Sequence, residues 1–169
     1  VFRYIVASGH TSADLAYSST TALALPESTT KIQDNLVNDG VLTLPVPGAT
    51  NSLAANKALV IDTEAPTAGT VSDGSGTDVT YSGSSTSITA NWTGFSDALS
   101  GIASYEIAVG TTSGATNILS WTSAGDVTTY TKSDLSLTHA TRYYVSTRAL
   151  DAAGNYSAAA TANGVIIDV

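Results

Sequence analysis

The sequence predicts an all-β fold made of tandem antiparallel β-sandwiches, the first of them incomplete at its N-terminal side. Short stretches rich in β-branched and aromatic residues recur along the 169 residues, and several alternate apolar with polar side chains. Clusters of Gly, Asn, Asp and Ser separate these stretches, as turns between strands require. Helical patterns are limited to possible single turns at residues 12–15 and 53–56.

Residues 1–62 are expected to form part of the first sandwich. Strand-like stretches occur at residues 1–6, 42–44 and 58–61. A sandwich needs about seven strands, and this segment offers too few. We therefore expect it to be the C-terminal part of a domain whose first strands precede it. Its open edge would be covered by a neighbouring domain, a swapped strand or a second copy of the chain.

A linker is predicted at residues 63–66. An apolar stretch runs into Asp62, and Pro66 follows four residues later, where the missing N–H interrupts strand pairing. The last residues, 165–169, repeat part of this pattern. The boundary leaves residues 67–169 for the second sandwich, which suits a single domain of roughly 100 residues.

The second sandwich contains the clearest strand signals. Its expected strands include residues 87–92, 105–109 and 143–150. Alternation in these stretches places one set of side chains toward a core. The predicted core residues are Trp92, Ile107, Leu137, Tyr143 and Val145.

Composition excludes several classes of partner. The net charge is −8, with only six basic residues. Nucleic acids and anionic lipids are bound through clusters of Lys and Arg, so neither is an expected partner. No apolar run is long enough for membrane insertion. The absence of cysteine excludes disulfides and thiolate metal sites, and it favours a bacterial extracellular protein over a disulfide-bonded eukaryotic one.

The motifs of residues 67–169 resemble those of a fibronectin type III domain of large bacterial surface proteins. Leu137 is followed by Thr141, from which apolar and hydroxyl residues recur at every second position to Ala149, with Tyr143 where that family has its tyrosine corner. Trp92 stands at the position of the core tryptophan, and residues 100–107 match the next strand. Residues 151–157, DAAGNYS, match the family's turn between its last two strands.

Residues 1–66 resemble the C-terminal half of a bacterial Ig-like adhesin repeat, on the motifs at 18–23, 32–34, 42–45 and 60–66. Residues 34–38 lack the glycine that such repeats have in the corresponding turn. The two resemblances imply a non-enzymatic structural or adhesive segment of a long cell-surface or secreted fibre, which projects or forms a binding tip. Its partners would be neighbouring domains of the parent chain and a surface glycan or protein.

The leading candidate for a functional site is a calcium site between the two domains. In a sandwich with this strand order, the linker and two of the loops meet at one end. Asp62 and Glu64 from the linker, Asp97 from one loop, and Asp151 and Asn155 from the other supply the hard oxygen ligands that calcium prefers. The alternative is that the loop residues are turn formers whose side chains bond their own backbone.

Three aromatic residues are the candidates for a second kind of site. Trp121, with Tyr130 and Tyr156, would bind sugar by stacking, which would make the chain a carbohydrate-binding or accessory module of a secreted hydrolase. The alternative for Trp121 is packing in the core. Catalysis is not expected, because His10 and His139 both lie in polar, turn-like stretches with no nucleophile motif.

Overall fold

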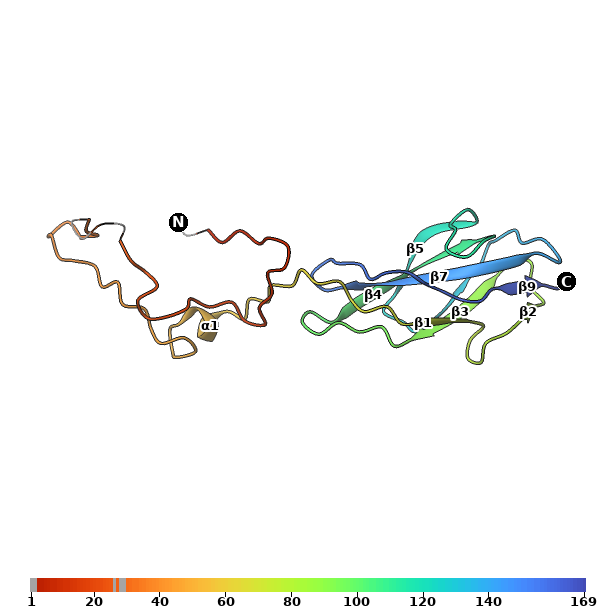
Figure 1. Cartoon of the computed structure of the whole chain (residues 1–169), viewed down its shortest axis with the longest axis horizontal. Helices are drawn as coiled ribbons and strands as arrows, with labels where there is room; N and C mark the ends of the chain where they lie inside the picture. The colour runs from red at the N-terminus through yellow and green to blue at the C-terminus, as the bar shows by residue number, and fades with distance from the viewer. Residues whose placement is uncertain (1–2, 26, 28–29) are drawn as a thin grey trace. The chain divides into compact units, whose positions relative to one another are not determined.

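The computed structural model describes residues 3–25, 27 and 30–169, and the chain forms two compact units (Figure 1). The first unit ends at Asp62 and the second is Thr63–Val169. All strands found in the described part of the chain belong to the second unit. The protein is therefore all-β, as predicted. No helix among the described residues has the length and apolar character needed to cross a membrane.

The first unit contains little regular structure. Its helix is the single turn α1 (Leu53–Asn56), as residues 53–56 predict, while 12–15 form none. Ser52 caps α1 by accepting a hydrogen bond from the backbone N–H of Ala55 at 3.1 Å. The isolated bridges Ser12–Ile61 and Gln33–Asp39 are its β-type pairings.

The strands expected in the first unit are not formed. Residues 3–6, 42–44 and 58–61 run as irregular chain, and Val1 and Phe2 lie outside the described residues. A β-strand is stable only when a neighbouring strand takes up its N–H and C=O groups and its apolar face is covered. Here apolar side chains of the expected strands stay exposed: Ile5 is 70% exposed and Val60 47%. Strand-like composition without a partner strand therefore did not produce a strand.

The second unit is a sandwich of two sheets. The smaller sheet has three antiparallel strands in the order β1 (Thr70–Asp73), β3 (Ile88–Thr93) and β6 (Thr129–Lys132). The larger sheet has the order β2 (Tyr81–Ser82), β9 (Val165–Ile167), β7 (Arg142–Asp151), β4 (Ile102–Gly110) and β5 (Leu119–Gly125), and β8 (Ala160–Thr161) also pairs with β7. Figure 1 shows β4 and β7 side by side along the sandwich.

One pairing departs from the antiparallel arrangement that the sequence predicts. β2 pairs with β9 in parallel, through Tyr81–Ile166 and Ser82–Ile167. β1 belongs to the other sheet, where it pairs with β3. The chain therefore crosses from the smaller sheet to the larger sheet between Asp73 and Tyr81. Both sheets gain an edge strand from one short stretch of chain.

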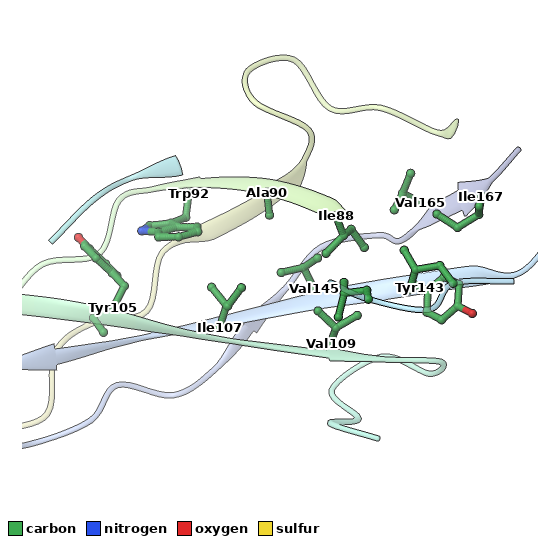
Figure 2. Close-up of a cluster of buried hydrophobic side chains, with 13 residues drawn as sticks. Ile88, Ala90, Trp92, Tyr105, Ile107, Val109, Tyr143, Val145, Val165 and Ile167 are labelled. Carbon is green, nitrogen blue, oxygen red and sulfur yellow. The ribbon is translucent and has the colours of Figure 1, made fainter. Parts of the chain in front are cut away.

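The core lies between the two sheets and contains all five residues predicted for it. Trp92 is 3% exposed, Ile107 1%, Leu137 7%, Tyr143 2% and Val145 0%. In Figure 2 the β3 side chains point toward those of β4 and β7. The rings of Trp92 and Tyr105 lie 5.4 Å apart between centroids.

Tyr143 forms the predicted tyrosine corner. Its hydroxyl accepts a hydrogen bond from the backbone N–H of Thr138 at 3.0 Å. Thr138 lies in the connection before β7, which turns sharply at Ala140, where φ is +59°. The tyrosine thus ties its own strand to the turn that precedes it.

Candidate metal centre

The loop between β3 and β4 is folded around the carboxylate of Asp97. Its Oδ1 accepts backbone N–H groups from Leu99 at 3.1 Å, Ser100 at 2.8 Å and Gly101 at 2.8 Å. Burial acts to raise the pKa of Asp97, but these three donors outweigh it and hold the pKa below its usual value. Asp97 is therefore an ionised and well-oriented carboxylate.

The turn after β7 is built in the same way around Asp151, which is 2% exposed. Asp151 Oδ1 accepts the backbone N–H groups of Ala153 at 2.9 Å and Asn155 at 2.8 Å. Its Oδ2 accepts the side-chain amide N–H of Asn155 at 2.8 Å. Gly154 has φ of +98°, a conformation that an L-residue rarely adopts and that closes the turn.

Backbone hydrogen bonds bring these loops and the incoming chain to the same end of the sandwich. Thr67 and Ser96 exchange N–H···O bonds of 2.8 and 3.3 Å, so the chain after the linker runs beside the β3–β4 loop. The N–H of Ala152 donates to the carbonyl of Gly101 at 3.1 Å, which joins that loop to the turn after β7. A backbone hydrogen bond therefore holds the two turns together.

Two of the five predicted ligands converge within the second unit. Asp97 and Asp151 each offer one carboxylate oxygen, and these two oxygens lie within 4.8 Å of each other. The third predicted carboxylate, Asp62, is the last residue of the first unit and directly precedes the linker. Calcium binds oxygen at about 2.3–2.6 Å, so ligands on opposite sides of one ion are separated by up to about 5 Å. The spacing fits a shared cation.

The other two predicted ligands are not part of this group of carboxylates. Glu64 is exposed in the linker. Asn155 directs its amide N–H toward Asp151, so as placed it orients that carboxylate. The turn-former interpretation of Asp97, Asp151 and Asn155 also holds, because all three make the local hydrogen bonds that it expects. The two interpretations are compatible, since a carboxylate oxygen has lone pairs for more than one partner.

The predicted aromatic site is arranged differently from a sugar-binding platform. Trp121 on β5 and Tyr156 after the turn both stack on the guanidinium of Arg148, whose Cζ lies 4.5 and 4.0 Å from the two ring centroids. Trp121 is thus on the outer face of the larger sheet and not in the core. Tyr130 belongs to the smaller sheet and packs against the core, so it does not join them. This arrangement does not favour sugar stacking.

Sequence reasoning missed Glu106 and Arg148. They pair across β4 and β7, and Arg148 donates to Glu106 Oε2 from Nε at 2.9 Å and from Nη2 at 2.7 Å. The sequence did contain a signal: each residue stands at an outward position of a strand whose alternate residues are apolar, and the two carry opposite charges. Without the pairing register, that signal does not show which charges face each other.

Comparisons with known proteins concern the fold. No protein-family model matches the sequence, and no curated protein sequence matches it. The chain is similar to the crystal structure of domains A168–A170 of titin, with a TM-score of 0.41 and 24% identity, over 63% of this chain and 32% of that one. It therefore spans about a third of the titin structure. It is also similar to an Fn3-like protein from Clostridium thermocellum, with a TM-score of 0.34 and 21% identity, over 61% of this chain and 88% of that one.

Proposed function

We propose that the chain is a non-enzymatic structural segment of an extracellular fibre protein, and that calcium binds at the end of its sandwich where the linker enters. The observation that carries the proposal is that carboxylate oxygens of Asp97 and Asp151, on two turns fixed by their own hydrogen bonds, lie within 4.8 Å of each other. Asp62, which immediately precedes the linker, would be the third ligand. A cation would relieve the repulsion between the three charges.

The expected role of the ion is mechanical. Asp62 is separated from the first paired residue of the sandwich, Thr67, by only four residues. An ion that contacts Asp62 together with Asp97 and Asp151 would attach both ends of this short linker to the same scaffold. The linker would then lose most of its freedom, and a pulling force along the chain would reach the sandwich through a stiff connection.

A structural role also agrees with the placement of the two histidines, which acid–base catalysis would most often use. His10 is exposed and 2.9 Å from the hydroxyl of Tyr4 in the first unit. His139 is exposed in the second unit, 3.8 Å from Asp168.

Calcium titration of the whole chain tests the proposal. Extracellular modules bind calcium with Kd of roughly 10⁻⁴–10⁻³ M, so millimolar calcium is needed. At ten times Kd, binding stabilises the folded state by about 1.4 kcal/mol, which raises Tm by several degrees. We expect Asp62→Asn to remove most of this increment in calorimetry and thermal unfolding. Glu64→Gln is the matched control: it removes a neighbouring linker carboxylate outside the group and should leave the increment intact.

The mechanical role has its own measurement. Small-angle scattering of the wild-type chain should show a wider range of overall dimensions after chelation, whereas Asp62→Asn should look the same with and without calcium. If several millimolar calcium gives no heat of binding and no change in Tm, the three aspartates are turn formers only and the proposed calcium site does not exist.

A further inference from the structure

The turn that carries Asp151 is connected to a cluster of side chains on the outer face of the larger sheet. This cluster, the arginine stack, consists of Glu106 on β4, Trp121 on β5, Arg148 on β7 and Tyr156. The Arg148 and Glu106 side chains are only 27% and 20% exposed. The guanidinium is in contact with a carboxylate and with two rings at once, which fixes its position more firmly than an exposed ion pair would.

Tyr156 is the member of the stack that touches the turn. It follows Asn155 directly, and it forms a bridge with Leu150 on the other side of the turn. Its ring lies 4.0 Å from Arg148 Cζ, and its hydroxyl donates to Glu106 Oε1 at 3.2 Å. The closing end of the turn is therefore attached to the sheet by a side chain that reaches β4 and β7.

Asn155 is the residue whose position depends on this attachment. Its backbone N–H and its side-chain amide both donate to Asp151, at 2.8 Å each. A shift of Tyr156 would move the adjacent Asn155 and so change both hydrogen bonds that orient the Asp151 carboxylate. Residues that orient a metal ligand through hydrogen bonds typically change metal affinity by about 10–100-fold when removed.

We propose that the arginine stack positions the calcium ligand Asp151 by fixing the conformation of residues 151–156. None of its four side chains belongs to the group of carboxylates that would contact the ion, so its effect on affinity passes through the turn. The proposal rests on the calcium site proposed above. It also makes a statement that needs no calcium: the turn is less ordered when the stack is incomplete.

The competing explanation is that the turn's own hydrogen bonds are enough to fix its conformation. Besides the bonds to Asp151, the N–H of Ser157 donates to the carbonyl of Ala149 at 2.9 Å, and the buried Ser157 hydroxyl accepts the N–H of Ala149 at 2.9 Å. If these bonds suffice, the stack serves the stability of the sheet alone. The two explanations differ in what happens to the turn when a distant member of the stack is removed.

Two variants separate them. Tyr156→Ala removes the ring next to the turn, and Trp121→Ala removes the ring on β5, which supports Arg148 from the other side. Both rings lie on the outer face, so we expect both variants to fold. In calcium-free protein, the amide hydrogens of Ala153 and Asn155 should exchange faster in both variants than in wild type. With calcium, calorimetry should show affinity roughly ten-fold weaker for Tyr156→Ala and weaker in the same direction for Trp121→Ala.

Tyr81→Ala is the matched control, because Tyr81 is a 62% exposed tyrosine on the edge strand β2 of the same sheet, outside the stack. It should change neither the exchange of the turn nor the affinity. Unchanged amide exchange in Tyr156→Ala overturns the proposal, and so does faster exchange with unchanged calcium affinity. If the wild-type chain binds no calcium, the proposed function fails, and the exchange measurement alone then decides whether the stack orders the turn.

Discussion

One buried carboxyl group inside the sandwich, that of Asp73, has a strongly raised pKa. Asp73, the last residue of β1, is 0% exposed. Its Oδ2 accepts the backbone N–H of Gly164 at 2.9 Å, while its Oδ1 meets no donor among the described residues. Burial raises the pKa of Asp73 to about 6, the N–H of Gly164 and the charge of Arg142 oppose that rise, and Asp78 adds to it. The carboxyl group of Asp73 therefore keeps its proton to a higher pH than an exposed aspartate does.

The raised pKa of Asp73 predicts a pH dependence of stability. The usual value is 3.8 and the folded value is about 6, so the folded state holds this proton more tightly than the unfolded state does. The resulting stabilisation is complete below pH 3.8 and is lost as the pH rises through 6. Two units of pKa correspond to at most about 3 kcal/mol. We expect Asp73→Asn to stabilise the protein at pH 7 and to lose this advantage near pH 4.

Urea unfolding at pH 4, 5, 6 and 7 measures this difference. Asp134→Asn serves as the control, because Asp134 is exposed and its φ of +59° suits asparagine as well as aspartate. It should follow the wild-type pH profile. An Asp73→Asn protein that is less stable than wild type at pH 7 would show that the charged carboxylate is satisfied in the folded state.

At the scale of elements, β7 organises the sandwich. It pairs with β4 along most of its length and also with β8 and β9. Its side chains alternate strictly between the core and the outer face, so that two adjacent tyrosines have different roles. Tyr143 is 2% exposed and forms the corner with Thr138, whereas Tyr144 is half-buried on the outer face.

This alternation predicts unequal effects of the same substitution at neighbouring positions. Tyr143→Phe removes the acceptor of the Thr138 N–H and should lower the free energy of unfolding by roughly 1 kcal/mol, and somewhat more if that N–H finds no water. Tyr144→Phe, the matched control on the outer face, should cost much less. Chemical denaturation of both variants gives the comparison. Equal costs for the two would contradict the role of the corner.

A substitution on strand β3, in the opposite sheet, tests the contribution of the core to stability. Trp92 packs against Tyr105 in the core. Trp92→Ala should cost roughly 3–5 kcal/mol, since it removes a large buried ring and leaves a cavity that neighbouring side chains fill only in part. A Trp92→Ala protein with the wild-type denaturation midpoint would show that the core is not built around this ring.

At the scale of the whole molecule, the two units differ in how well they bury apolar surface. Every buried apolar residue of the core found in the described chain lies at or after Ile88. In the first unit, by contrast, Ile5, Ile32 and Val46 are 70%, 53% and 62% exposed. Without a core of its own, the first unit lacks the main favourable contribution to folding.

Residues 1–62 expressed alone are therefore expected to remain unfolded as a monomer. Their amide NMR signals should be poorly dispersed and should exchange within minutes. Residues 63–169 expressed alone should give dispersed, protected signals, because the sandwich closes its own core. Dispersed and protected signals from 1–62 as a monomer would show that this segment is a complete small fold. Ordering that appears only on association would support covering by another copy of the chain.

The sequence by itself determined the parts of the protein that depend on periodicity and local turns. Alternation identified the strands of the second unit and the five predicted core residues. The turns around Asp97 and Asp151 followed from the residues next to them, because an aspartate accepts N–H groups from its own loop. That Asp62, Asp97 and Asp151 share one cation stays a prediction from the strand order.

Only the tertiary structure decided which groups face each other across strands and which strands exist. The pairing register placed Glu106 opposite Arg148, and the fold brought both Trp121 and Tyr156 against the guanidinium. The crossing of the edge strand buried Asp73 and made β2 parallel to β9. Among the described residues of 1–62, strand-like composition gave no strands. The reason is the same in each case: a strand is completed by its neighbours, and the neighbours are chosen by the whole chain.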